Sequence, residues 1–592
     1  MCKTFKGNQN KTRYQVRITA AHRQTQTFTA EAGANLLDIC RQQQIPVEAA
    51  CNGRGICGKC RVQVIQGNVP AAEEERRVFT AQEIADGYRL ACRVRVMSDL
   101  TVRLFSQQNA MEIQMPEPAA GNSISKMPEP AAGSSFSKVQ GGASDVGPAA
   151  ETEPAARLKT HERQLTEYCI AVDLGSTTLA AVLIDQSGSI LSQVTAVNSQ
   201  RAYGGDVISR IQASNEGRKD ELRRCICRDL EQMFCALVQK LEKMIKMQIK
   251  ISRVAIAGNT TMLHLLRGYS CERLGQAPFE PVNLQTECLP YRELFSDVAG
   301  CVQAAVYLLP GMSAFAGADI TAGLYSSGFW QMPEDETAFF VDLGTNGELA
   351  CGSRKGFVTS AAAAGPAFEG GRLSCGIPGI PGAVSKVSYL YHRVRIQTIG
   401  QKKPCGICGT GALEAVAALL GEGLLNKDGL LAPQLFEQGM VLACREDGSR
   451  ICLTQADIRE IQMAKAAIRA GIEILLLRYG QMLGQDAGPA VSRVYLAGGF
   501  GYYLSADTAT AIGLFPPEWR DKIILCGNTS LKGAVLFLSD PSCAGGLVKI
   551  CSKNTSIQLE DDPRFQEIYI QQMGFGNSSG RSLHAAAVNV RT

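Results

Sequence analysis

The sequence predicts a protein of the α/β class, α+β when taken as a whole, in which a small domain precedes a larger unit. Strand-like and helix-like segments alternate along most of the 592 residues, as they do in α/β proteins. Glycine is abundant at 59 residues, and aromatic residues make up only 6% of the chain, which suits loops whose backbone approaches a ligand. A stretch rich in Pro, Ala, Gly and Ser divides the chain into unequal parts.

The dividing stretch contains a tandem duplication. Residues 115–126 read MPEPAAGNSISK, and residues 127–138 read MPEPAAGSSFSK. Such a segment has too little apolar surface to offset the entropy of ordering it. We therefore expect a flexible linker over 109–164, and a frayed tail over 574–592.

Composition excludes several functional classes. The net charge is +4, which gives no basic field for nucleic acid. No run of about 18 apolar residues occurs, and the first residues lack the apolar segment of a signal peptide, so we expect a cytoplasmic protein without a membrane span. In such a chain, 22 cysteines indicate metal or redox chemistry rather than a disulfide framework.

The small domain shows a regular order of elements. Alternating residues predict strands at 14–19 and 24–29, and Asn35 can cap a helix that extends to about Gln44. A loop rich in Gly and Cys follows, and then strands at 61–66 and 93–105. This order predicts a β-grasp fold for the domain.

The glycine-rich loop carries three of four regularly placed cysteines. Cys51, Cys57 and Cys60 have the spacing C-x5-C-x2-C, and Cys92 follows later. Three thiolates on one loop and a distant fourth are the ligands of a [2Fe–2S] cluster, and the glycines let backbone N–H groups face the sulfurs. A zinc site is the alternative, although zinc ribbons usually pair two C-x2-C motifs and this loop has one. The segment resembles the [2Fe–2S] ferredoxins, in a spacing closer to the adrenodoxin-like variant.

The larger unit contains the same short element twice. Residues 170–178 read IAVDLGSTT and residues 339–348 read FFVDLGTNGE, each a strand, a tight turn and a second strand. The turns can present backbone amides and hydroxyls to phosphates, and an aspartate can hold the waters of a Mg²⁺ ion. Two facing hairpins would thus bind Mg-ATP. The residues predicted to do so are Asp173, Gly175, Ser176, Thr177 and Thr178 in the first hairpin, and Asp342, Gly344, Thr345, Asn346 and Gly347 in the second.

Three further segments suit a nucleotide site. Gly258, Asn259 and Thr260 form a turn between a strand and a helix. Gly498 and Gly499 end a strand and could admit an adenine or ribose. Asp319 precedes a helix, where it could orient a catalytic water or serve as an ordinary N-cap.

The order of these motifs resembles the actin, sugar-kinase and heat-shock-chaperone (ASKHA) superfamily, in which two ribonuclease-H-like lobes close over ATP. The segment at 317–324 is similar to the element that carries the general base in its sugar kinases. With the cysteine domain and the linker, the chain closely resembles the reductive activators of corrinoid-dependent proteins, through segments such as YGGDVISRI (203–211) and AAGPAFEGG (363–371). The resemblance implies a [2Fe–2S] ferredoxin-type domain over 1–108 and ASKHA lobes over 165–335 and 336–573.

The resemblance also implies a function, namely the ATP-dependent one-electron reduction of Co(II) to Co(I). The implied partners are the corrinoid protein of a methyltransferase system and a low-potential electron donor, and the family suggests a homodimer. Alternatives are a radical-dehydratase activator, which lacks a ferredoxin domain, a small-molecule kinase, and a redox-gated nucleotide-binding regulator. Cys405 and Cys408 form a C-x2-C that is either a redox pair or part of a glycine-rich loop opening a helix.

Overall fold

The computed structural model describes residues 12–20, 25–43, 45, 47–104, 167–296, 298, 300–344, 346–391, 393–499 and 504–576. The predicted linker over 109–164 lies outside these residues, as does the predicted tail from residue 577 onward. The first three residues of that tail are packed rather than frayed. Phe575 is buried and its N–H donates to the carbonyl of Lys427, while Gly574 accepts from the Lys465 ammonium.

The N-terminal domain is a five-stranded sheet in the order β2-β1-β5-β3-β4, with helix α1 across it. The strands are β1 Arg13–Ala20, β2 Gln26–Glu31, β3 Arg61–Gln66, β4 Tyr88–Leu90 and β5 Leu100–Leu104, and the helices are α1 Leu36–Gln42 and α2 Ala81–Ala85. Asn35 caps α1 as predicted, because its side chain accepts from the N–H groups of Leu37 and Asp38. The β-grasp prediction and the general element order are confirmed.

One predicted strand of this domain is shorter in the structure. Residues 93–105 were expected to form one strand, but only Leu100–Leu104 does so. The preceding residues bond instead to the turn that enters α1, where Leu36 donates to the carbonyl of Val94 and Val96 donates to that of Ala34.

The first lobe of the larger unit is a six-stranded sheet in the order β10-β11-β9-β6-β7-β8. Its strands are β6 Tyr168–Leu174, β7 Thr178–Ile184, β8 Ile190–Val197, β9 Ile251–Gly258, β10 Glu287–Pro290 and β11 Ala305–Leu308, and its helices are α3 Val207–Ala213, α4 Lys219–Ile245, α5 Thr260–Arg267 and α6 Tyr291–Leu294. Alternate residues of β6 face opposite sides, so Ile170 and Val172 pack with the α4 core. Cys169 and Ala171 pack on the other face.

The second lobe repeats this plan in the order β21-β20-β12-β13-β14-β22. Its strands are β12 Thr337–Leu343, β13 Gly347–Ser353, β14 Gly356–Ala362, β20 Val491–Ala497, β21 Ile523–Gly527 and β22 Asn554–Ser556. In each lobe an antiparallel hairpin is flanked by a third antiparallel strand and by one parallel strand, which is β9 beside β6 and β20 beside β12. The repeated VDLG sequence is therefore a repeated fold, and the ribonuclease-H-like prediction is confirmed.

The second lobe also carries an insertion and a helical face. These elements are β15 Ala383–Leu390, β16 Arg393–Thr398, β17 Gly406–Ile407, α8 Gly409–Gly421, β18 Met440–Cys444, β19 Arg450–Leu453, α9 Gln455–Met482, α10 Ala506–Ala511 and α13 Phe565–Gln571. The capping box predicted at Thr454 and Asp457 opens α9, which packs against β13 and β14.

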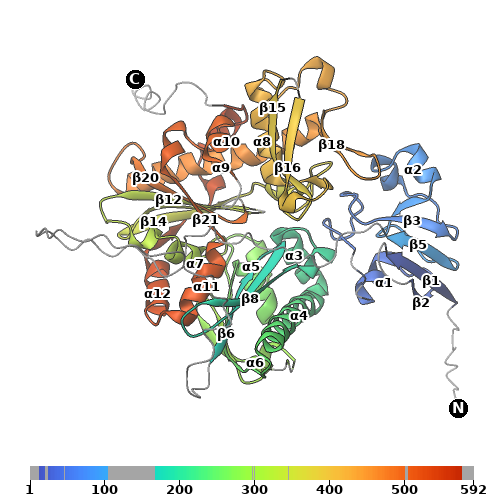
Figure 1. The fold of residues 1–592 in the computed structure, drawn as a ribbon, viewed down its shortest axis with the longest axis horizontal. Helices are drawn as coiled ribbons and strands as arrows, with labels where there is room; N and C mark the ends of the chain where they lie inside the picture. The colour runs from blue at the N-terminus through green and yellow to red at the C-terminus, as the bar shows by residue number, and fades with distance from the viewer. Residues whose placement is uncertain are drawn as a thin grey trace, which may run out of the picture.

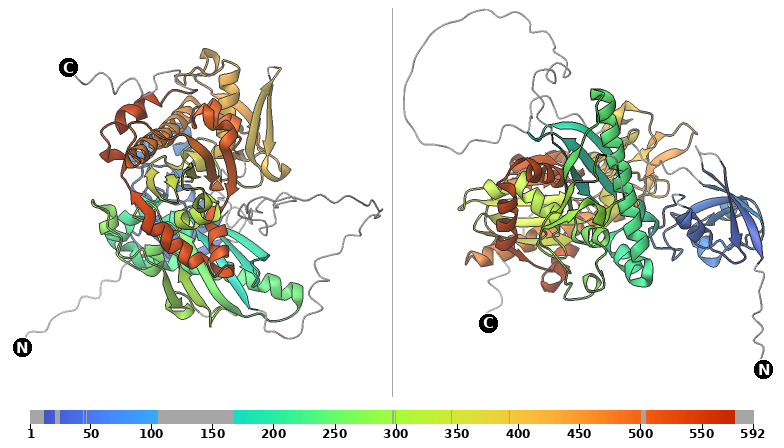
Figure 2. Two further views of the ribbon diagram at one scale, coloured as in Figure 1. Left: turned by 90° about the vertical axis from the view of Figure 1, so that its left-hand side faces the viewer. Right: turned by 90° about the horizontal axis from the view of Figure 1, so that it is seen from below.

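Helices at the centre of the molecule join the two lobes. α7 (Ala318–Ser326) and α11 (Thr529–Ser539) pack against each other, and α12 (Cys543–Lys553) lies beside them. α11 comes late in the chain, yet its side chains pack on β6 and β9 of the first lobe. Figure 1 shows α11 and α12, in red, beside the green strands of that lobe, and Figure 2 shows the same arrangement from two other sides.

The contact between α7 and α11 predicts a steric sensitivity at Gly533. A Cβ atom there would lie 2.5 Å from the Ala322 Cβ, whereas one at Gly545 of α12 would meet nothing within 4 Å. Gly533→Ala is expected to lower stability by about 1–3 kcal/mol because packed helices must separate. Gly545→Ala, the matched control, should be neutral or slightly stabilising. Thermal unfolding of both variants measures the difference, and equal melting temperatures would contradict the packing.

Candidate functional site

The four predicted cysteines lie together in the N-terminal domain. Cys51, Cys57 and Cys60 are on the loop between α1 and β3, and Cys92 follows β4. The sulfurs form two pairs, since the thiols of Cys51 and Cys57 are hydrogen-bonded and the Sγ atoms of Cys60 and Cys92 are 3.4 Å apart. Among the described residues, no three His, Cys, Asp or Glu side chains are grouped so that they could hold a metal ion. Two thiolate pairs match the division of ligands between the two irons of a [2Fe–2S] cluster.

The loop directs hydrogen-bond donors at the sulfurs. The hydrogen bond from Cys57 is the main cause that lowers the pKa of Cys51, to about 4, and backbone N–H groups of Ile56, Cys57 and Gly55 lower it further. Gly55 has φ of +80°, and a Cβ atom there would lie 2.5 Å from the Arg93 Nε. The donor set and the backbone conformation thus fit a cluster of thiolate-bound iron.

One edge of this loop remains open to solvent. Ile56 has 69% of its surface exposed, and Cys57 is half-buried, whereas Cys51, Cys60 and Cys92 are buried. The cluster position is therefore reached from the side of Cys57.

A second site lies between the two lobes, in a cavity of about 320 Å³. The turn between β6 and β7 and the turn between β12 and β13 both line it. The predicted residues that line it are Asp173, Gly175, Ser176, Thr177, Thr178, Asn259, Asp319, Asp342, Gly344, Asn346, Gly498 and Gly499.

Three predicted residues that the structure describes do not line this cavity, and a fourth is not tested. Thr345 lies outside the described residues. Thr260 turns away, because its hydroxyl donates to the carbonyl of Ser313. Gly258 packs at the end of β9 against Leu174, and Gly347 packs against Ile468 of α9. These glycines allow close packing behind the hairpins.

Asp319 also differs from its predicted position. It lies in the first turn of α7, and the N-cap is Gly317. A Cβ atom at Gly317 would lie 2.6 Å from the Asn259 Cα, so a glycine is needed where the two segments meet.

Half-buried carboxyl groups that line the cavity dominate its electrostatics. Burial raises the pKa of Asp319 to about 7, and the charge of Asp173 adds to the effect. Burial, with the charges of Asp319, Asp173 and Glu369, raises the pKa of Asp342 to about 8. The pKa of Asp173 is also raised by burial, although Asn528 and Ser530 each donate a hydrogen bond of 2.8 Å to it.

Such a group of carboxyls suits a divalent cation. Acidic side chains that repel one another in a desolvated site stay protonated unless a cation neutralises them. Mg²⁺ prefers one or two carboxylates, several waters and phosphate oxygens. Asp173 and Asp342 would supply the carboxylates, and the two turns would supply amides and hydroxyls to phosphates.

Several lining residues were not predicted from the sequence. Glu369 accepts a 2.7 Å hydrogen bond from the Thr177 hydroxyl and so joins the lobes across the cavity. Glu348 lies on β13 opposite Asp342, and its pKa is raised well above its usual range by burial. Asn528 and Ser530 come from the start of α11. Glu369 lies in the segment 363–371, which carries part of the family resemblance. No local pattern in that segment indicates a contact with the first hairpin.

Cys405 and Cys408 are both free thiols in this structure. The Cys405 thiol donates to the carbonyl of Pro381, and the Cys408 thiol donates to that of Val384. Burial raises the pKa of both thiols. Cys408 is the N-cap residue of α8 and lines the nucleotide cavity, as the glycine-rich loop interpretation predicts.

A search of the described residues for a helix long and apolar enough to cross a membrane found none.

Three family models match successive parts of the chain. Residues 20–97 match the 2Fe-2S iron-sulfur cluster binding domain, residues 168–332 match the RACo middle region, and residues 336–584 match the C-terminal domain of RACo, the ASKHA domain. The three matches follow one another in order and span most of the chain.

Curated relatives and a solved structure are similar over most of their lengths. The corrinoid activation enzyme RamQ of Eubacterium limosum is 28% identical, over 91% of this chain and 96% of its own. A [Co(II) methylated amine-specific corrinoid protein] reductase of Methanosarcina barkeri is 25% identical over 69% of this chain and 77% of its own. The solved structure of a reductive activator for corrinoid, iron-sulfur protein covers 96% of this chain and 99% of its own, at 25% identity and a TM-score of 0.63.

The cysteine geometry predicts a selective loss of iron. Anaerobically purified protein is expected to hold about two irons and two sulfides per chain. Cys57→Ala should lose them, because one iron loses one of its two thiolates. Cys40→Ala is the matched control, since Cys40 is buried in the core on α1, and it should keep both. Iron and sulfide analysis with electron paramagnetic resonance checks this, and equal iron contents would rule out the ligand set.

The buried carboxyls predict a stability that falls as pH rises. A carboxyl whose pKa is about 8 when folded and about 4 when unfolded binds more protons in the folded state between these values, so stability is lost as pH rises from about 4 to 8. In EDTA, the melting temperature of the wild type should fall by several degrees from pH 5 to pH 8. Asp342→Asn should fall less, whereas Asp486→Asn, an exposed control, should follow the wild type. Identical pH profiles for all three proteins would contradict the buried-carboxyl analysis.

Proposed function

This chain belongs to the RACo family of reductive activators, and from this premise we propose that it reduces the cobalt of a partner corrinoid protein from Co(II) to Co(I) in an ATP-dependent reaction. The observation that carries the proposal is the presence of both sites in one chain that aligns with a corrinoid activation enzyme over 91% of its length. A low-potential redox site alone or a nucleotide cavity alone would fit many proteins. A redox site followed by a nucleotide cavity in one chain favours an activator that couples ATP hydrolysis to electron transfer.

Cys51, Cys57, Cys60 and Cys92 are the proposed cluster ligands. When bound, a [2Fe–2S] cluster supplies a carrier of single electrons. The chain contributes the amide donors of residues 55–57, which lower the cost of extra negative charge on the sulfurs. The open edge at Ile56 gives a docking partner access to this loop.

The cavity between the lobes is the proposed ATP site. The turns at 175–178 and 344–347 would hold the phosphates, and Gly498 and Gly499 would face the adenosine. Gly498 has φ of +82°, and a Cβ atom there would lie 2.5 Å from the Asp342 Oδ1. Asp173 and Asp342 would hold the waters of Mg²⁺, and Asp319 would orient the attacking water from the first turn of α7.

We further propose a domain organisation, a location and a set of partners for this protein. The chain would divide into a ferredoxin-type domain (1–108), a linker (109–164), two ASKHA lobes (165–335 and 336–573) and a tail (574–592). The protein would act in the cytoplasm as a homodimer, take electrons from a low-potential donor and use neither nucleic acid nor membrane. The corrinoid protein would belong to a methyltransferase system; the Methanosarcina barkeri relative is named for acting on a methylated amine-specific corrinoid protein.

The decisive experiment follows Co(I) formation in the visible spectrum of a corrinoid protein mixed with this protein, a reductant and Mg-ATP. Asp173→Ala is expected to lower both ATP turnover and Co(I) formation by about 100-fold, the scale of losing one electrostatic contact in an active site. Its iron content should stay that of the wild type. Cys57→Ala should hydrolyse ATP but form no Co(I).

Asp486→Asn is the control for the aspartate variant, because that side chain is exposed and far from the lining of the cavity. It should behave as the wild type in all three assays. ATP-independent formation of Co(I) by the wild type would refute the proposed function.

A further inference from the structure

The loop that carries Cys51, Cys57 and Cys60, called here the cysteine loop, makes its backbone contacts to the first lobe through one short segment. We define the bridging segment as residues 198–205, between β8 and α3. Two backbone hydrogen bonds of 3.2 Å join it to the cysteine loop, from Ala49 N–H to the carbonyl of Arg201 and from Gly205 N–H to the carbonyl of Ala50. The next residue in the loop is Cys51. Figure 1 shows the N-terminal domain, in blue, against α3 and α4 of the lobe.

Side chains complete this interface, and nearly all of them are polar. Arg41 of α1 donates from Nε and Nη2 to the carbonyl of Ala202, at 2.9 and 2.7 Å, and its guanidinium lies 4.8 Å from the centre of the Tyr203 ring. Asn52 bonds Arg41 on one side and Glu216 on the other. Asp38 pairs with Arg218 at 3.6 Å.

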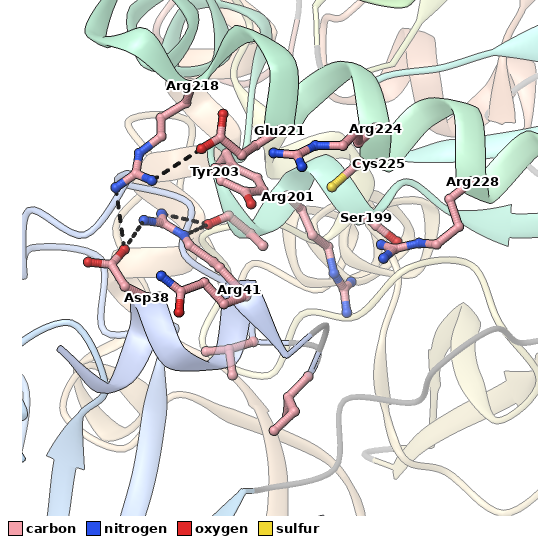
Figure 3. Close-up of a pocket in the computed structure, with 14 residues that line it drawn as sticks. Asp38, Arg41, Ser199, Arg201, Tyr203, Arg218, Glu221, Arg224, Cys225 and Arg228 are labelled. Carbon is pink, nitrogen blue, oxygen red and sulfur yellow. Dashed lines mark hydrogen bonds and ion pairs between the residues drawn. The ribbon is translucent and has the colours of Figure 1, made fainter. Parts of the chain in front are cut away.

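The interface encloses a basic cavity of about 350 Å³, drawn in Figure 3. Arg201, Arg224 and Arg228 of the lobe line it together with Arg41 and Arg218, and only Asp38 and Glu221 are acidic. The Asp38–Arg218 pair at its edge is exposed, and exposed ion pairs each contribute only about 0–1 kcal/mol.

The same bridging segment holds the first phosphate hairpin. Asn198 donates from Nδ2 to the carbonyl of Gly175 at 3.0 Å, and its N–H donates to the carbonyl of Thr177 at 2.9 Å. Arg210 of α3 donates to the carbonyl of Ser176 at 2.6 Å and to the carbonyl of Gly204 at 3.1 Å. One guanidinium therefore contacts both the hairpin and the segment that binds the cysteine loop.

Arg210 is fixed in this position. Its side chain is fully buried, and it also donates to Gln200 and contacts the Met262 sulfur. A buried guanidinium without its partners would carry a large desolvation cost, so a change at the Ser176 carbonyl must be accommodated at Gly204. The route from the hairpin to the cysteine loop thus passes through the Arg210 side chain. It then crosses between the domains through the hydrogen bond from Gly205 N–H to the carbonyl of Ala50, the residue before Cys51.

We propose that nucleotide binding between the lobes and docking of the cysteine loop are linked through Asn198, Arg210 and the bridging segment, so that ATP strengthens docking. This inference rests on the proposed ATP site. The direction follows from the peptide groups involved. The carbonyls of Gly175 and Ser176 belong to the same peptide units as the N–H groups of Ser176 and Thr177. A phosphate that accepts from these N–H groups polarises the units and strengthens the hydrogen bonds that Asn198 and Arg210 make to their carbonyls.

Linkage requires a reciprocal effect. If ATP favours docking by a given factor, docking favours ATP binding by the same factor. Loss of the γ-phosphate weakens the hydrogen bonds that Asn198 and Arg210 make to the hairpin. Hydrolysis therefore favours release of the N-terminal domain, which can then reach its partner. The expected factor is about fivefold, the lower end of typical couplings between sites.

Amide hydrogen exchange tests this directly, because two of the exchanging amides, those of Ala49 and Gly205, form the contact. The anaerobic, cluster-loaded full chain is compared without nucleotide, with Mg-ADP, and with Mg²⁺ and a non-hydrolysable ATP analogue. We expect the analogue to slow exchange in peptides covering 47–56 and 199–206 by about fivefold, and ADP to slow it less. The hairpin peptide at 170–178 reports nucleotide binding itself.

Two variants and one control isolate the route. Arg41→Ala removes the interface contacts, so it should speed exchange of 47–56 and raise the Kd for the ATP analogue by about fivefold, measured calorimetrically. Arg210→Lys keeps the charge but cannot bridge two carbonyls, so protection of the hairpin should no longer slow exchange of 47–56. Arg17→Ala, an exposed arginine of β1, should match the wild type.

The outcomes separate this proposal from the one on which it rests. An analogue that leaves the hairpin peptide unprotected would refute the ATP site, and the linkage with it. Protection of the hairpin without slower exchange at 47–56 would overturn the linkage alone. So would an Arg41→Ala variant that exchanges faster at 47–56 but binds the analogue as the wild type does. If Arg210→Lys fails to fold, Arg41→Ala decides the question.

Discussion

Desolvated carboxyl groups between the lobes are the constraint around which the larger unit is arranged. Asp173, Asp319 and Asp342 line one cavity, and the negative charge of one raises the cost of ionising another. Asn528 and Ser530 offset part of this cost at Asp173, and they come from the start of α11. Because those donors must reach the first lobe, α11 crosses to it from late in the chain. The tight packing of α11 on α7 at Gly533 follows from that crossing.

The two sites, and the contact between them, depend on polar groups of different kinds. The nucleotide cavity relies on acidic groups that need a cation, whereas the cysteine loop relies on backbone N–H groups that need no counterion. The contact between them relies on arginines that donate to neutral carbonyls. Because a guanidinium is charged, its bond to a carbonyl strengthens when that carbonyl is polarised, so the contact can respond to what binds at the hairpin. This suits a connection that must report on one site without disturbing the chemistry of the other.

Much of this arrangement was predicted from local patterns, and the remainder required contacts between distant segments. The repeated VDLG sequence predicted two equivalent hairpins, because a strand, a tight turn and a strand are encoded within ten residues. Asn35 and Thr454 predicted helix starts for the same reason. Glu369 and Asn528 were missed because their partners, Thr177 and Asp173, lie 192 and 355 residues away. Gly258 and Gly347 belong to the right motifs, but their positions serve packing behind the turn.

The open edge of the cysteine loop has a kinetic consequence. Ile56 and Cys57 face solvent while Ala49 and Ala50 are held by the bridging segment. The proposed electron donor would therefore reach the loop without first displacing it from the lobe. Loading of the electron and binding of the nucleotide can then occur in either order, as in a random-order two-substrate enzyme. Neither substrate would have to wait for the other, and under the proposed linkage the committed step would be release of the domain.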